Sequence, residues 1–187
     1  PGPGAALFNA IHAALGPLAI IAEDLGEVTP DVEVLRRAFA FPGMRILQFA
    51  WGEDDTAERR FLPHRYEPDT VVYTGSHDND TTLGWWANAP ESTRHHLREY
   101  LATDGRAVHW DLIRAACASV ADTAVYPLQD VMGLDGAHRM NFPGQSSGWW
   151  VWRFEWAQVP ADAAARLRRM AGLYDRAPTT TNSAGMR

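Results

Sequence analysis

The sequence predicts an α/β fold in which helices cover a parallel sheet. Short apolar runs, rich in β-branched and aromatic residues, alternate along the chain with stretches of helical periodicity. The runs show no clear alternation, which is typical of strands that are covered on both faces. The predicted strands are residues 18–22, 44–49, 70–74 and 123–128. These four units amount to half of an eight-unit barrel, and an independent doubly wound sheet is the alternative.

Length and composition indicate one globular domain with a sizeable core, because the chain has 187 residues of which 46% are hydrophobic. The net charge of -6 argues against nucleic acid as the main partner. No apolar run approaches the length of a membrane span and no signal-peptide pattern opens the chain, so no membrane partner is expected. Cys117 is the only cysteine, which rules out an internal disulfide and agrees with a reducing, cytoplasmic location.

The most informative stretch is residues 70–86, where a predicted strand ends in a cluster of ionisable side chains. His77, Asp78, Asn79 and Asp80 follow one another there. In parallel α/β folds, ligands and catalytic groups sit at the carboxyl ends of strands. A turn or a helix cap explains Asn79 and Asp80 equally well. His77 and Asp78 are therefore the first functional candidates.

The predicted strand 18–22 ends in a second pair of carboxylates, Glu23 and Asp24. Because successive side chains of a strand point to opposite faces, the two carboxylates are expected to have different roles. One can face the mouth of a barrel while the other accepts hydrogen bonds from neighbouring loops.

The tryptophans point to a sugar as the ligand. Four of the eight fall within residues 149–156, and Trp85 and Trp86 follow the His77–Asp80 cluster. Flat amphipathic rings beside polar groups suit a molecule with apolar faces and hydroxyl edges. Ordinary core packing is the alternative for most of these rings.

Helices are predicted from apolar periodicity and from residues that start and stop helices. Residues 5–15 form the first pattern. A second helix is expected to start at Thr29 and Pro30, which suit a helix cap and a first helical position. Later helical patterns cover residues 92–102, 109–120 and 161–174.

No metal and no cofactor is expected. His77, Asp78 and Asp80 are potential ligands, but no zinc-type spacing or calcium-loop pattern accompanies them. The glycines do not form a phosphate loop after a strand.

Five motifs together resemble the amylomaltase family, the 4-α-glucanotransferases also called disproportionating enzymes or glycoside hydrolase family 77. The motifs are IIAEDLG at 20–26, PGMRILQFA at 42–50, VVYTGSHDNDTTLGWW at 71–86, PLQD at 127–130 and RMNFPG at 139–144. Each motif alone is weak, but five in the family's order with similar gaps are specific. The resemblance reaches to about Trp156.

The resemblance implies the second half of a (β/α)8 TIM barrel of the α-amylase superfamily, with strands five to eight and their helices. Residues 1–176 would form this partial catalytic barrel, and 177–187 a loose tail. The implied activity is retaining transfer of α-1,4-glucan segments between maltooligosaccharides.

The same resemblance assigns roles to four residues. Glu23 matches the general acid/base, and Asp78 matches the carboxylate that stabilises the transition state. His77 matches a histidine that binds donor-sugar hydroxyls, and Asn141 lies in a family-like loop near the donor site.

The family's nucleophilic aspartate lies in an R-I-D-H-F-R-type motif that this sequence does not contain. The N-terminal half of the barrel is therefore expected as a missing partner. Retaining transfer needs a nucleophile and an acid/base about 5–5.5 Å apart. The chain alone is accordingly expected to transfer no glucan.

The residues leave two other functions open. A hydrolase of the same superfamily would pass the glycosyl group to water rather than to a sugar hydroxyl. A non-catalytic carbohydrate-binding module would use its tryptophans to bind glucan, and its carboxylates would only cap turns.

Overall fold

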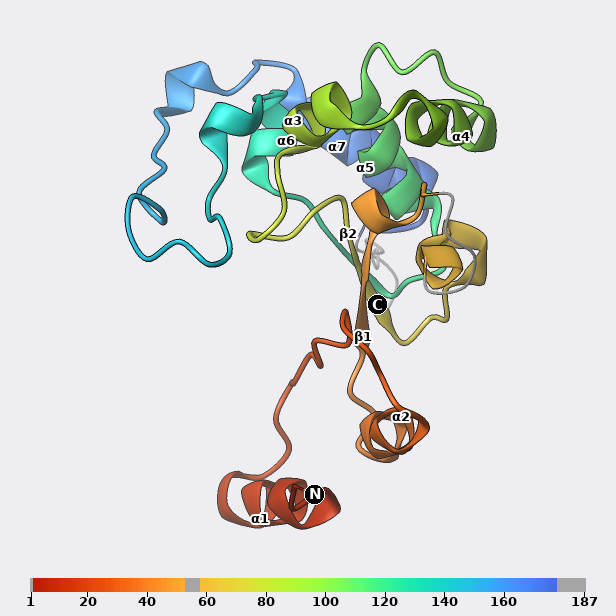
Figure 1. The fold of residues 1–187 in the computed structure, drawn as a ribbon, viewed down its shortest axis with the longest axis vertical. Helices are drawn as coiled ribbons and strands as arrows, with labels where there is room; N and C mark the ends of the chain where they lie inside the picture. Colours follow the sequence, from red (N-terminus) through yellow and green to blue (C-terminus); the bar gives the residue numbers. More distant parts are fainter. Residues whose placement is uncertain (1, 53–57, 178–187) are drawn as a thin grey trace, which may run out of the picture.

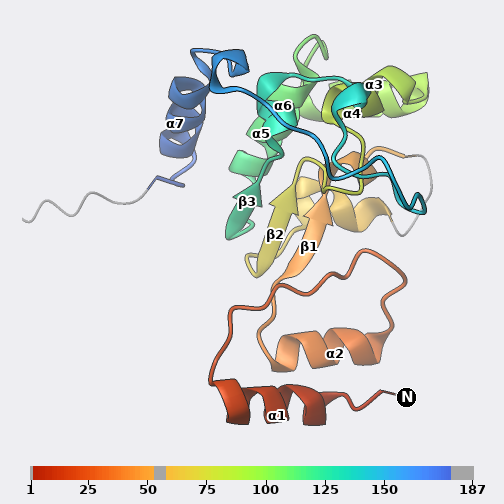
Figure 2. The ribbon, with the colours of Figure 1, turned by 90° about the vertical axis from the view of Figure 1, so that its left-hand side faces the viewer.

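A computed structural model describes residues 2–52 and 58–177 of the chain. At its centre is a parallel sheet in the order β1 (Gly43–Ile46), β2 (Thr70–Tyr73) and β3 (Thr123–Val125), shown in Figure 2. Met44 pairs with Val71, and Val72 pairs with Ala124. The predicted α/β fold with a parallel sheet is confirmed for this part of the chain.

Helices lie at both ends of the sheet (Figures 1 and 2). Those beyond the end at which the strands begin are α1 (Ala5–Leu15) and α2 (Pro30–Ala38). The other helices are α3 (Thr82–Asn88), α4 (Glu91–Leu101), α5 (Val108–Ala118), α6 (Leu128–Met132) and α7 (Ala163–Leu173). Of these, α3, α4 and α6 lie beyond the end at which the strands finish, which places them around the turns that carry the predicted site.

The main hydrophobic core packs β2 against α4 and α5. Val72, Leu97 and Leu112 are fully buried in it. A second cluster joins α5 to α7 through Ile113 and Met170. Because α5 contributes to both clusters, it is the helix that ties the sheet to the C-terminal part of the described chain.

The first predicted strand is wrong, since residues 18–22 do not join the sheet as a strand. Ala22 donates a backbone hydrogen bond to Pro42 O across 2.9 Å, just ahead of β1. Leu18 and Ile21 remain 43% and 50% exposed. An apolar run becomes a strand when neighbours satisfy its backbone groups. Among the described residues, the bond from Ala22 is the one backbone hydrogen bond that residues 18–22 make, which is too few for a strand ladder.

Two other predicted strands are shorter than expected. The strand predicted over 44–49 ends at Ile46, because a 3-10 turn follows it and Gln48 N–H donates to Thr74 O across 3.3 Å. The strand predicted over 123–128 ends at Val125. Proline at position 127 has no N–H for the ladder, and α6 begins directly after it.

The predicted helices are confirmed, with ends that differ by a few residues at most. Residues 5–15 coincide with α1, and the patterns at 92–102 and 109–120 correspond to α4 and α5. The pattern at 161–174 contains α7. Within the described ranges, no helix has both the length and the apolar character needed to cross a membrane.

The predicted loose tail, residues 177–187, lies outside the described residues except for Ala177.

Candidate active site

The turn after β2 carries His77 and Asp78, and its path depends on Gly75. A Cβ atom at Gly75 would lie 2.6 Å from Nε2 of Gln48. The same Nε2 donates a hydrogen bond to Asp80 O across 2.9 Å. The turn therefore packs against a buried glutamine, which fixes where the end of β2 presents its polar side chains.

Asp78 is the centre of a polar cluster at this strand end. Asn141 Nδ2 donates to Asp78 Oδ1 across 2.6 Å, and His77 Nε2 lies 3.5 Å from Asp78 Oδ2. About half of the Asp78 side chain, 50%, is exposed. The structure thus brings together three of the predicted site residues and leaves the carboxylate accessible to a ligand.

Arg139 was not predicted from the sequence as a site residue. Its Nη2 donates to Asp78 O across 2.8 Å, and its Nε donates to Asn141 O across 3.1 Å. The guanidinium also lies 4.5 Å from the centre of the Phe142 ring. Arg139 therefore fastens the RMNFPG loop to the turn after β2. The presence of Arg139 in the RMNFPG motif was the one sequence signal for a role in the site. Its contact with Asp78 could not be predicted from that motif, because the two residues are 61 positions apart.

Asp130, the last residue of the PLQD motif, holds the turn after β2 by hydrogen bonds. Its carboxylate is 1% exposed and accepts hydrogen bonds from Thr74 Oγ1 at 2.5 Å, Thr82 N at 2.7 Å and Thr82 Oγ1 at 2.8 Å. Burial raises the pKa of Asp130 above its usual range, and these hydrogen bonds oppose the shift. Thr74 follows β2 and Thr82 opens α3, so Asp130 holds the turn that carries Asp78 at both of its ends.

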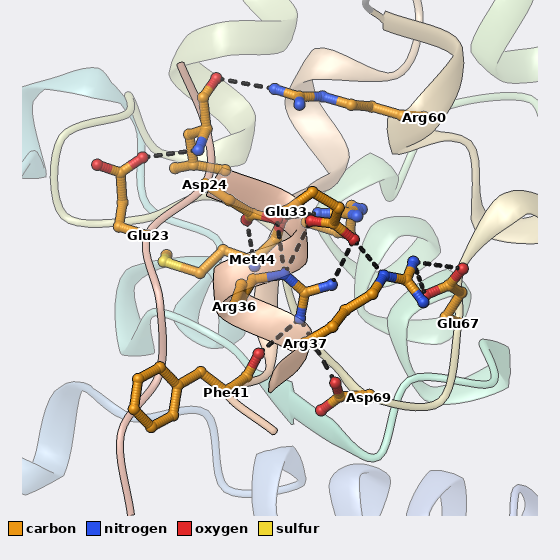
Figure 3. Close-up of polar contacts among 12 residues, drawn as sticks. Glu23, Asp24, Glu33, Arg36, Arg37, Phe41, Met44, Arg60, Glu67 and Asp69 are labelled. Carbon is orange, nitrogen blue, oxygen red and sulfur yellow. Dashed lines mark hydrogen bonds and ion pairs between the residues drawn. The ribbon is translucent and has the colours of Figure 1, made fainter. Parts of the chain in front are cut away.

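Glu23 and Asp24 belong to a second cluster, beside the start of β1 (Figure 3). Leu25 N–H donates to Glu23 Oε1 across 2.7 Å, and the Glu23 side chain is exposed. Asp24 is 6% exposed and accepts hydrogen bonds from Met44 N at 2.7 Å and Arg45 Nη1 at 3.0 Å. The two neighbouring carboxylates differ as expected: one is accessible, and the other is held by structural hydrogen bonds.

Arg36 of α2 is a buried cation near Asp24, with its Nε 4.0 Å from Asp24 Oδ2. It donates to Phe41 O at 2.5 Å and to the two carboxylate oxygens of Glu33 at 2.9 and 3.0 Å. Asp69 Oδ2 lies 3.4 Å away. The hydrogen bonds that Arg36 and Arg37 donate to Glu33 hold the pKa of Glu33 down to about 2. Figure 3 shows that the network ties α2 to the segments that lead into β1 and β2.

The turn that follows Glu23 is held by Arg60. Its Nη2 donates to the carbonyl oxygens of Leu25 and Gly26, each across 3.1 Å. The backbone around Glu23 is therefore fixed by Asp24 on one side and by Arg60 on the other, as Figure 3 shows.

A cavity of about 640 Å³ is lined from both clusters. Its walls include Ile21, two residues before Glu23, and His77, the neighbour of Asp78. Further walls come from side chains in the segment 139–154. Among the described residues, no hydrogen bond or ion pair joins Glu23 to Asp78. Glu23 lies near the start of β1 and Asp78 follows the end of β2, and the cavity is lined by neighbours of both carboxylates rather than by the carboxylates themselves.

This arrangement suits a polyhydroxylated ligand. Aromatic rings can cover its apolar faces, while carboxylate, imidazole and amide groups bind its hydroxyls. Within the described ranges, no group of three His, Cys, Asp or Glu side chains is placed to hold a metal ion.

Fold and site define a parallel α/β protein with a ligand site at its strand ends. The family of 4-alpha-glucanotransferases, glycoside hydrolase family 77, matches residues 1–158. The chain belongs to this family, and the resemblance read from the five motifs is confirmed.

Two relatives show how far the similarity extends. The 4-alpha-glucanotransferase of Thermus thermophilus is 46% identical over 182 residues, which cover 93% of this chain and 36% of that protein. The chloroplastic/amyloplastic 4-alpha-glucanotransferase of Solanum tuberosum is 48% identical over 180 residues, 94% of this chain and 31% of that protein. The chain therefore spans about a third of the length of these curated relatives.

The fold also matches a solved structure of the family. Amylomaltase from Streptococcus agalactiae, solved in complex with acarbose, aligns with a TM-score of 0.87 and 32% sequence identity. The alignment covers 94% of this chain and 36% of that one.

Proposed function

We propose that this chain supplies part of the active site of a 4-alpha-glucanotransferase that transfers α-1,4-glucan segments between maltooligosaccharides. The reaction is a retaining double displacement. The observation that carries the proposal is the Asp78 carboxylate, held by Asn141 and flanked by His77 next to the cavity of about 640 Å³. Family membership and the relative solved with acarbose support it.

Glu23 is the general acid/base in this proposal. Its carboxyl group gives a proton to the leaving glycosidic oxygen, and the resulting carboxylate later takes a proton from the acceptor hydroxyl. Oε1 accepts the Leu25 N–H, which orients the carboxyl group. Exposure of the side chain gives the substrate access to it.

Asp78 stabilises the transition state by its negative charge. Positive charge develops at the anomeric carbon as the glycosidic bond breaks, and a fixed carboxylate lowers the energy of that state. Asn141 and Arg139 fix the position of this carboxylate without entering the reaction. His77 binds hydroxyls of the donor sugar.

The nucleophile comes from the part of the relatives' length that this chain does not cover. We propose that the three strands, with the segment 18–22, correspond to strands five to eight of a TIM barrel, and that the rest of the barrel is the partner. Without its nucleophile the first displacement cannot occur, so the isolated chain transfers no glucan. A cytoplasmic location fits the single cysteine.

A chimera tests the proposal. This chain replaces the matched part of the Thermus thermophilus relative, and the chimera is incubated with maltotriose. Longer oligosaccharides are expected, and the Glu23→Gln and Asp78→Asn chimeras should form them at less than roughly a hundredth of the rate. A net rise in reducing ends without longer products would show a hydrolase instead. Glucan binding with no activity in any version would show a binding module.

A further inference from the structure

Four aromatic side chains occupy alternate positions of one segment: Trp150, Trp152, Phe154 and Trp156. We call them the aromatic track. The ring centroids of Trp152 and Phe154 are 5.4 Å apart with an interplanar angle of 20°. Those of Phe154 and Trp156 are 5.1 Å apart with an angle of 83°, an edge-to-face contact. These contacts join the rings of Trp152, Phe154 and Trp156 one after another along the segment, which contains neither α-helix nor strand at these positions.

The aromatic track starts at the proposed donor-sugar residue and leads outward. The ring centroid of Trp150 is 5.0 Å from that of His77. Trp152 and Phe154 line the same cavity as His77. At the far end, Trp156 is 79% exposed. The track is therefore continuous with the site and ends at the surface.

The backbone at Trp150 supports a ligand-binding role for the track. Its φ of 66° lies in the left-handed region that a bulky side chain rarely adopts. Its N–H donates to Met140 O across 2.8 Å, which holds this conformation. The ring is nevertheless 55% exposed, so burial of the indole does not compensate for the strain. The conformation places the Trp150 indole against the His77 ring.

We propose that the aromatic track binds the part of an α-1,4-glucan chain that extends beyond the sugar held at His77 and Asp78. This inference rests on the proposed function. A polymer of repeating sugars presents one apolar face after another, and successive aromatic rings along the segment offer apolar surface to it. A short oligosaccharide would fill the cavity without reaching Trp156.

Calorimetric titration of the 187-residue chain with maltoheptaose and with maltotriose tests this. Trp156→Ala is expected to weaken maltoheptaose binding by about fivefold or more, and maltotriose binding by less than about twofold. Trp156→Phe keeps a flat ring and should retain most of the affinity. Val151→Ala is the matched control, because Val151 is 67% exposed on the same segment but belongs to no ring contact of the track.

Circular dichroism of each variant verifies that the fold is kept. If Trp156→Ala binds maltoheptaose as tightly as the unsubstituted chain, the track is overturned while the proposed function stands. If the unsubstituted chain binds neither sugar, the track is overturned, whereas the proposed function is decided by the activity of the chimera.

Discussion

Asn141 Nδ2 donates a 2.6 Å hydrogen bond to Asp78 Oδ1, which joins two loops 63 positions apart in the chain. One oxygen of the carboxylate is thereby fixed by an amide, and the other lies near the His77 ring. The turn after β2 and the RMNFPG loop thus form one polar site. This contact is a physical reason for the sequence to contain both the motif at 71–86 and the motif at 139–144.

Loss of that hydrogen bond should reduce catalysis more than binding. Asn141→Ala in the chimera is expected to lower kcat about ten- to a hundredfold with little change in KM, because Asp78 loses its orientation toward the transition state. Steady-state kinetics on maltotriose measure this. Gln145→Ala is the control on the same loop, since the Gln145 amide bonds only Trp149 among the described residues. An unchanged kcat for Asn141→Ala would show that the contact is incidental.

Asp24→Ala should destabilise the protein strongly. The substitution leaves buried Arg36 and partly buried Arg45 without this carboxylate, and breaking a buried ion pair on one side costs about 3–5 kcal/mol. Urea unfolding of the chimera measures the loss. The control is Asp104→Ala, which removes an exposed pair with Arg106 and should cost less than about 1 kcal/mol. Equal effects of the two substitutions would contradict the structural role of Asp24.

Glu33 should make stability fall in acid. Its pKa is about 2 in the folded chain against an ordinary value of 4.5, so the folded state binds its proton less readily than the unfolded state. The stabilisation is fully present above about pH 4.5 and is lost as the pH falls toward about 2. The free energy of unfolding should therefore drop more from about pH 6 to about pH 3 in the parent than in Glu33→Gln. If the free energy of unfolding falls equally with pH in the parent and in Glu33→Gln, the lowered pKa of Glu33 is refuted.

Local sequence signals predicted the elements that depend on local chemistry. The apolar periodicity of residues 5–15 gives α1, and the β-branched run at 70–74 gives β2. The strand predicted at 18–22 is absent, because strand formation depends on pairing with neighbouring strands and not on the apolar run alone. The apolar pattern there is as strong as in the true strands.

The candidate site was predictable in part for a similar reason. His77 and Asp78 follow a strand within one motif, so their proximity is visible in the sequence. The contact of Arg139 with Asp78 joins segments far apart in the chain, and the backbone conformation of Trp150 depends on its hydrogen bond with Met140. The ion pairs around Arg36 were missed because charged residues on a helix usually face solvent.

The isolated chain should associate with itself. β1 and β3 are the two edge strands of the described sheet, and residues 18–22 precede β1 without joining it. Leu18 and Val120 are 43% and 58% exposed. Unpaired strand edges and apolar patches favour contact between copies. Sedimentation velocity should detect dimers or larger species, and these should decrease in a Leu18→Lys, Thr123→Lys double variant.

Leu173→Lys is the control for this experiment, because Leu173 is 64% exposed on α7, away from both edges. A monodisperse monomer that unfolds in one sharp transition would contradict the expectation. It would favour an independent α/β domain.

The assignment of Glu23 as acid/base is tested most directly by azide rescue of the Glu23→Ala chimera. The substrate is α-maltosyl fluoride, whose leaving group needs little help from an acid. Azide, which needs no general base, should then attack the glycosyl intermediate on the face that Glu23 has vacated. We predict faster turnover and α-maltosyl azide with retained configuration, identified by NMR. A β-configured azide would show that Glu23 is the nucleophile. Full transfer activity of the Glu23→Ala chimera without azide would show that Glu23 takes no part in the reaction.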